Sequence, residues 1–252
     1  MPEFLTFALA APLAAMGEIA VGEHRGSWDR PGRSAVLGLI AACLGIGRDD
    51  EAAHAALEVG YGLALRRQRL GPLLADYHTA QVPPVRRGRH FATRAEELAA
   101  DDLETILSRR DYRADLLVLA ALWPRPNARW PLDGIEAALR APHYTPYFGR
   151  KSCPLMLPLS PRRDEATNPA AALALRAEEG PEPERQLAIR ADPPLVTMTA
   201  ADAREYGLQF DRVEIRRDAV RSRRRWQFAL REDAVLSGSP RDMSRGAGAS
   251  VP

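Results

Sequence analysis

Lysine is almost absent from this sequence. Of the 35 basic residues only Lys151 is a lysine, and the others are arginines. A GC-rich genome accounts for such a ratio, and a net charge of +2 is too small to indicate a nucleic-acid-binding protein. Arginine nevertheless binds phosphate bidentately and stacks on bases. Any argument for nucleic acid therefore depends on where the arginines lie.

Cysteine is also scarce. Cys43 and Cys153 are the only two, with no CxxC pair and no histidine at ligand spacing. This argues against a zinc site and against a disulfide framework. We expect no metal and no cofactor.

Long apolar runs are missing as well. No uninterrupted run reaches the roughly 18 residues that a membrane-spanning helix needs. The apolar N-terminus lacks a basic region and carries Glu3, which argues against a signal peptide. We therefore expect a cytoplasmic chain with no membrane partner, whose first residues form a strand.

The rest of the composition is that of a globular protein, with 46% hydrophobic and 27% charged residues. A strand is predicted over 4–10, ending at Pro12. A buried helix is predicted over 34–46 with Ser34 as its N-cap, and a second helical piece over 49–57.

Two strands are predicted next, over 59–67 and 73–77. Residues 81–104 lose their apolar periodicity, which indicates an insertion that projects from the domain. A central strand over 115–123 and an amphipathic helix over 132–139 follow. This order favours an α+β domain of the ferredoxin-like or RRM-like (RAMP-type) class.

The last third of the chain changes character. Residues 161–192 are rich in acids, alanine and proline, and we expect an acidic loop or linker. Alternating residues within 193–236 predict a small β-rich C-terminal part. Residues 237–252 are expected to be a disordered tail.

The most specific string is YTPYFGRKSCP, residues 144–154. Glycine lets the backbone approach a phosphate, adjacent cations neutralise it, and tyrosine rings offer faces for unstacked bases. The alternative is a rigid, proline-bounded turn with packed tyrosines. The candidate RNA-binding residues here are Tyr144, Tyr147, Gly149, Arg150, Lys151 and Ser152.

A second cluster lies at the start of the predicted helix, in the string GSWDRPGRS. A helix N-terminus presents free N–H groups that stabilise an oxyanion. Arg25, Arg30, Arg33 and Ser34 are therefore candidates, although the spacing matches no phosphate-binding motif. Simple helix capping with solvated arginines is the alternative.

Two further features are weaker. His78 is a candidate RNA-binding residue; it could also act as a general base, but no partner for that role is visible nearby in the sequence. Residues 212–231 hold eight arginines and two acids, interleaved with Trp226 and Phe228. Such a run is usually a solvated face, and the aromatic residues raise the chance of a nucleic-acid contact.

Taken together, several strings resemble motifs of the CasD family of subtype I-E Cascade. They are, in order, APLAAMG, RPGRSAVLGLIAACLGIGRDD, DYHTAQ, TILSRRDYRADLLV and YTPYFGRKSCPLMLPL. The resemblance covers residues 1–160. Met16 stands where the family often has tryptophan, and the C-terminal region is longer and richer in arginine.

The resemblance implies an RRM-like domain over 1–160 with a thumb over 79–110. It implies a non-catalytic cap on the 5′ handle of the crRNA, bound through Arg33, Ser34, Arg110, Tyr112 and residues 147–152. The implied partners are a backbone subunit of the CasC kind, touched by the thumb, a large subunit of the CasA kind and, indirectly, target DNA.

Two other functions stay open. A related subtype uses its own fifth-family protein as a metal-independent endoribonuclease that processes repeat RNA, and His78 or Tyr112 with Lys151 could supply a base and a cation. The chain could instead be a scaffold that binds only protein. In that case the cluster at Arg33 and the pair Arg150 and Lys151 would have no ligand.

Overall fold

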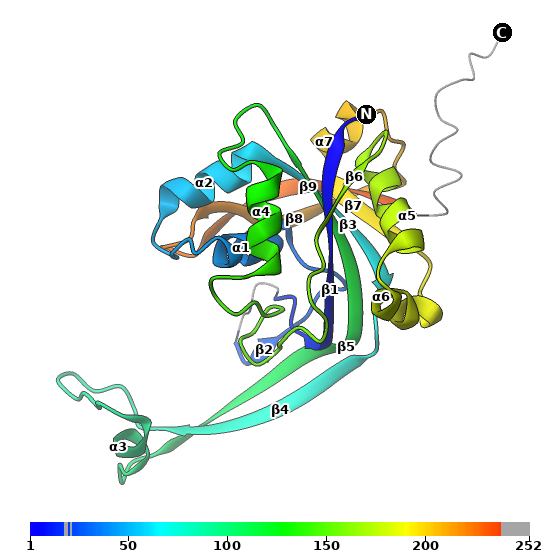
Figure 1. Cartoon of the computed structure of the whole chain (residues 1–252). Helices are drawn as coiled ribbons and strands as arrows, with labels where there is room; N and C mark the ends of the chain where they lie inside the picture. Colours follow the sequence, from blue (N-terminus) through cyan, green and yellow to red (C-terminus); the bar gives the residue numbers. More distant parts are fainter. Residues whose placement is uncertain (18–19, 21, 238–252) are drawn as a thin grey trace.

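The computed structural model describes residues 1–17, 20 and 22–237. One large, mainly antiparallel sheet of nine strands forms the body of the protein, with helices on both faces (Figure 1). Its order is β6-β1-β5-β3-β7-β9-β8, and β2 and β4 also pair with β5. The strands are β1 (Glu3–Ala14), β2 (His24–Arg25), β3 (Tyr61–Arg69), β4 (Leu73–Val82), β5 (Glu104–Pro124), β6 (Arg162–Glu165), β7 (Leu195–Thr199), β8 (Arg212–Ser222) and β9 (Gln227–Ser237).

Strand β1 is buried on both faces, so its sequence is apolar almost throughout. Successive side chains alternate: Leu5 and Phe7 enter one core, and Phe4 and Ala8 enter the other. The strand was expected to end at Pro12. It continues to Ala14 because β5 pairs with β1 on both sides of that proline.

One face is covered by α1 (Arg33–Cys43), α2 (Glu51–Gly60) and α4 (Leu132–Arg140). The sequence prediction of Ser34 as the N-cap of α1 is wrong, because Gly32 holds that position without a side-chain bond. The backbone N–H of Arg33 instead donates to a carboxylate from a distant strand, that of Asp218 in β8, at 2.6 Å.

The other face is covered by segments that the sequence analysis assigned to a linker. Residues 161–192 contain β6, α5 (Pro169–Glu179), α6 (Glu182–Leu187) and the short 3-10 helix η1 (Ala188–Arg190). Asn168 caps α5, and Leu173 packs into the second core. Arg176 is buried against Glu184 of α6, with Nη2 to Oε1 at 2.5 Å. The expectation of a loop or linker is therefore wrong.

Residues 193–236 contain strands, as expected, together with α7 (Ala200–Glu205). They do not form a separate part, because β7 pairs with β3 and continues the same sheet. Ser237 ends β9. The expected tail lies otherwise outside the described residues.

Strands β4 and β5 continue beyond the sheet as a long two-stranded arm with α3 (Arg94–Leu98) near its tip (Figure 1). They pair from Leu73 opposite Arg113 to Val82 opposite Glu104. The segment expected to project, 79–110, is the outer part of this arm. Its strands lacked apolar periodicity because the arm has little core to bury.

Within residues 1–17, 20 and 22–237, no helix combines the length and hydropathy needed to cross a membrane. The same residues hold no group of three or more His, Cys, Asp or Glu side chains that could bind a metal ion.

Candidate nucleic-acid interface

Three segments meet at the base of the arm: the end of β1, the middle of β5 and the loop 144–154. The loop folds back on itself, because Phe148 N donates to Cys153 O and Cys153 N donates to Arg150 O, each at 2.8 Å. It is fixed to β1 where Ala15 N donates to Phe148 O at 3.1 Å. The loop is thus a tight turn held against the sheet.

Gly149 is required by this docking. Its φ is +94°, and a Cβ at this position would lie 1.7 Å from the carbonyl oxygen of Ala15. The close contact that glycine permits here is therefore with the backbone of Ala15, directly after β1. The sequence analysis had assigned it to a phosphate.

Behind the loop, Tyr112 and Arg150 pack on each other. Tyr112 is buried beside Ala15 and Cys153, and the guanidinium carbon of Arg150 lies 4.7 Å from the centre of the tyrosine ring. Nη1 of Arg150 is buried and has no hydrogen-bond partner in the described part of the chain. A buried guanidinium N–H without an acceptor favours binding of an oxyanion.

The outer side of the loop is open to solvent. Lys151 and Ser152 are exposed, and the tyrosines Tyr144 and Tyr147 are 50% and 45% exposed. The loop therefore exposes a cation, a hydroxyl and two aromatic rings in the same short segment as Arg150.

One face of the arm continues from this loop. In the antiparallel ladder, Tyr112 lies opposite Leu74, Arg110 opposite Asp76 and His78 opposite Ser108. Directly opposite residues share a face, so Tyr112, Arg110 and His78 follow one another on it. The His78 ring bonds to the Asp76 carboxylate.

Strand β2 adds Arg25 to this region, because it pairs with β5 with Arg25 beside Arg110. Arg25 is exposed and donates to the carbonyl of Gly22. Its neighbour His24 bonds to Asp111 at 2.8 Å. Burial raises the pKa of Asp111, but His24 and Arg109 lower it more, so that its pKa lies below the ordinary value.

Arg30 and Arg33 are not available to a ligand in this structure, contrary to expectation. Arg30 is 2% exposed and bonds to Asp29 at 2.8 Å and to Glu214. Arg33 is 4% exposed and bonds to the Glu58 carboxylate at 3.0 Å. The backbone N–H of Arg33, at the N-terminus of α1, already donates to the Asp218 carboxylate.

Ser34 does not offer its backbone carbonyl to a ligand either. The residue is half-buried, and its carbonyl accepts a hydrogen bond from the Arg223 guanidinium. Of the second cluster predicted from the sequence, only Arg25 is exposed beside the arm.

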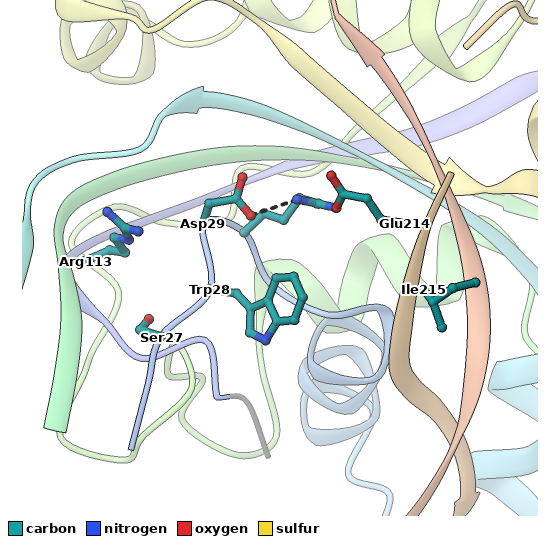
Figure 2. A pocket seen from close by; sticks show the side chains of 7 residues that line it. Ser27, Trp28, Asp29, Arg113, Glu214 and Ile215 are labelled. Carbon is teal, nitrogen blue, oxygen red and sulfur yellow. Dashed lines mark hydrogen bonds and ion pairs between the residues drawn. The ribbon is translucent and has the colours of Figure 1, made fainter. Parts of the chain in front are cut away.

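A shallow hollow of about 610 Å³ lies beside the arm base, between the segment before α1 and β8 (Figure 2). Trp28 lines this hollow, and the guanidinium of Arg216 lies 4.4 Å from its ring centre. Arg113 projects from β5 on one side, and its Nε is buried without a hydrogen-bond partner in the described residues. The lining residues are Ser27, Trp28, Asp29, Arg30, Arg113, Glu214 and Ile215.

The sequence analysis missed Trp28 and Arg113. An aromatic residue next to arginine in GSWDRPGRS was the available signal for Trp28. Arg113 had none, because only the fold brings it to the hollow that Trp28 also lines.

Comparison with known proteins gives a consistent result. A family model described as CRISPR-associated protein (Cas_Cas5) matches residues 4–232. The CRISPR system Cascade subunit CasD of Escherichia coli (strain K12) is 35% identical over 181 residues, which are 69% of this chain and 76% of that protein. The family match thus extends beyond residue 160, where the motif resemblance ended.

Two solved structures share the fold. A chain of a CRISPR RNA-guided surveillance complex aligns with a TM-score of 0.62 and 23% identity, covering 96% of this chain and 97% of that one. A crystal structure of a Cas protein aligns with a TM-score of 0.57 and 21% identity, covering 93% and 94%. At these identities the likeness concerns the fold alone.

Proposed function

Because the chain belongs to the CRISPR-associated (Cas_Cas5) protein family, we propose that it is a non-catalytic subunit of a Cascade surveillance complex that caps the 5′ handle of the crRNA. The observation that carries this proposal is the arrangement at the arm base. There Arg150 stacks on Tyr112 and keeps an unsatisfied N–H, beside exposed Lys151 and Tyr147.

We assign the first part of the chain to the ferredoxin-like (RRM-like, RAMP-type) class. In support, β1-α1-α2-β3 and β5-α4-β6 are two β-α-β units. Their strands have the order β6-β1-β5-β3, each antiparallel to its neighbour, which a ferredoxin-like unit requires. Strands β7 to β9 then extend this unit at its β3 edge.

The handle would bind through its backbone and its unstacked bases. Arg150 and Lys151 contact phosphate, while Tyr144 and Tyr147 stack on bases. Arg110, His78 and Arg25 extend the track along the arm. Phosphate contacts hold the strand in register without reading its sequence.

Protein partners would meet the arm. Large apolar side chains are exposed along it, with Tyr77 at 65% and Ile106 at 52%, which favours a protein contact. We assign this contact to the adjoining backbone subunit of the CasC kind. A large subunit of the CasA kind would lie nearby, target DNA would be met through the guide, and the complex would be cytoplasmic.

An endoribonuclease is the second candidate, and the pair Asp76 and His78 is the observation that favours it. A carboxylate that orients a histidine is a common way to prepare a general base. In the described residues, however, no hydrogen bond or ion pair links His78 to Tyr112 or to Lys151. We therefore keep the non-catalytic function as the proposal.

The test is the affinity for handle RNA over a series of salt concentrations. Each lost phosphate contact lowers the salt slope by about 0.7 for a single strand, so Arg150→Ala/Lys151→Ala should lower it by about 1.4. Arg185→Ala/Arg190→Ala, which removes the same charge from an exposed surface at α6 and η1, should leave the slope unchanged. An unchanged slope in a folded Arg150→Ala/Lys151→Ala variant, checked by circular dichroism, would refute the assignment.

A further inference from the structure

Six of the eight arginines of β8, β9 and the turn between them fall into two sets; of the other two, Arg212 bonds to Glu214 and Arg217 is exposed. Arg216, Arg223 and Arg231 point inward and are used by the fold. Arg216 covers Trp28, Arg223 donates to the Ser34 carbonyl, and Arg231 bonds to Asp218 and Asp233, each at 2.6 Å. This set explains only part of the run.

The other set lies at the turn between the strands. Arg221, Arg224 and Arg225 are exposed and form no ion pair with a carboxylate of the described residues. Trp226 follows them with 60% of its surface exposed. Arg48 lies 4.7 Å above the Trp226 ring and adds a further cation. We call Arg48, Arg221, Arg224, Arg225 and Trp226 the hairpin tip.

The hairpin tip is held in place by Glu51 at the start of α2. The Glu51 carboxylate accepts from the Ser222 hydroxyl at 2.7 Å and from the Arg224 N–H at 2.8 Å. These bonds, the one from Ser222 first, lower the pKa of Glu51. Its charge is therefore retained at neutral pH, and the cations and the tryptophan are presented on a fixed turn.

We propose that the hairpin tip binds a single strand of nucleic acid, with phosphates on its arginines and one base on Trp226. An unbalanced group of arginines attracts a polyanion, and an exposed tryptophan ring offers a stacking surface that a base can use only when unpaired. The proposal goes beyond handle binding, because the turn between β8 and β9 is held by Glu51 at the start of α2 and β8 contacts α1 and α2, whereas the arm is formed by β4 and β5 (Figure 1).

The probes are two 12-nucleotide oligonucleotides unrelated to the handle, oligo(U) and oligo(dT), titrated with the full chain across a salt series. Arg224→Ala/Arg225→Ala should lower the salt slope by about 1.4, from two lost phosphate contacts. Trp226→Ala should weaken binding by about 5- to 150-fold, the range for one stacked base. Arg185→Ala/Arg190→Ala is the control with the same change of charge and should bind as the unmodified chain does.

Trp226→Phe separates stacking from damage to the turn. It should retain most of the affinity and lose the quenching of tryptophan fluorescence that the oligonucleotide causes at Trp226. Whichever oligonucleotide loses more affinity in the tip variants identifies the strand as RNA or DNA.

The tip must also act independently of the handle site. In an Arg150→Ala/Lys151→Ala background, the tip variant should lower the slope by the same further amount. Equal binding by folded tip variants and the unmodified chain would overturn the proposal. If those variants instead lose only a partner subunit in a pull-down, the hairpin tip is a protein contact and the proposal is also overturned.

Discussion

Asp218 stands at the N-terminus of α1, where an anionic ligand could otherwise bind. Its carboxylate accepts from the Arg33 N–H at 2.6 Å and from the Arg231 guanidinium at 2.6 and 3.1 Å. A carboxylate at a helix N-terminus stabilises the helix through the free N–H groups and their partial positive charge. One residue of β8 therefore serves as the cap that Ser34 was expected to provide.

Asp218→Ala should lower the free energy of unfolding by about 3 kcal/mol, because Arg231 stays buried with one partner fewer. Urea denaturation measures this. Glu205→Ala, which removes an exposed carboxylate from α7, should change stability by less than about 0.5 kcal/mol. Equal midpoints for the two variants would contradict this role of Asp218.

Gly149→Ala should disturb the loop at the arm base. The new Cβ would collide with the Ala15 carbonyl, and φ at +94° is already unfavourable for alanine, so a loss of more than about 1 kcal/mol is expected. Gly88→Ala is the matched control, since its φ is also positive, at +80°, but nothing lies within 4 Å. Thermal unfolding and handle affinity should both change more for Gly149→Ala, and equal effects would show that contact with Ala15 is unimportant.

For single residues, the sequence predicts which side chains have suitable chemistry better than it predicts which partners those side chains have in the fold. Arg150 and Lys151 were candidates from local chemistry and Tyr112 was a candidate from the family resemblance, and the structure brings Tyr112 and Arg150 together. The place of Arg33 could not be predicted, because its partner Asp218 is 185 residues away. Nothing in a local pattern shows that the backbone N–H of Arg33 is bound by a distant carboxylate, or that its guanidinium is buried against Glu58.

At the scale of elements, the outer part of the arm is largely exposed, and its internal contacts are local. Arg86 and Arg89 both bond to Asp102, and Thr93 caps α3. Strands β4 and β5 supply the remaining order through backbone pairing. The arm can therefore be shortened without opening either core.

Deleting Pro83 to Asp101 should leave a folded protein, because Val82 and Glu104, which pair at the end of the arm, remain and can be joined by a short turn. Incorporation into a complex with neighbouring subunits should fall. Co-purification measures incorporation, and circular dichroism checks the fold. Assembly equal to that of the unmodified chain would mean that the arm tip is a tolerated surface loop.

Strands and helices were predicted correctly where apolar side chains recur at the period of an element that packs on the core. The strand over 115–123 and the helix over 132–139 are present as β5 and α4, whose inward residues include Val118 and Ile135. Helix α5 was missed because Leu173 is the only large apolar residue on its buried face, beside Ala170, Ala172 and Arg176, which gives a weak periodic signal. Asn168 followed by Pro169 was a usable sign of a helix start.

For the whole molecule, the main question is whether it acts on RNA or only holds it. The isolated chain should not cleave repeat-containing RNA at a specific position, because no hydrogen bond or ion pair of the described residues links the pair of His78 and Asp76 to Tyr112 or Lys151. Gel analysis of RNA incubated with the chain alone measures this. Specific cleavage that disappears in His78→Ala or Tyr112→Phe would establish the endoribonuclease function instead.

The ion pairs around Arg30 join the beginning of the chain to its last strands. Arg30 bonds to Glu214 and, at 3.5 Å, to Asp233, which are 184 and 203 residues away. During synthesis on the ribosome, α1 is therefore made long before the strands that complete its surroundings. Contacts of such long range slow folding, since the chain loses loop entropy before they form. The nascent chain must also keep its apolar first strand from aggregating until β5 and β6, which pair with it, have been translated.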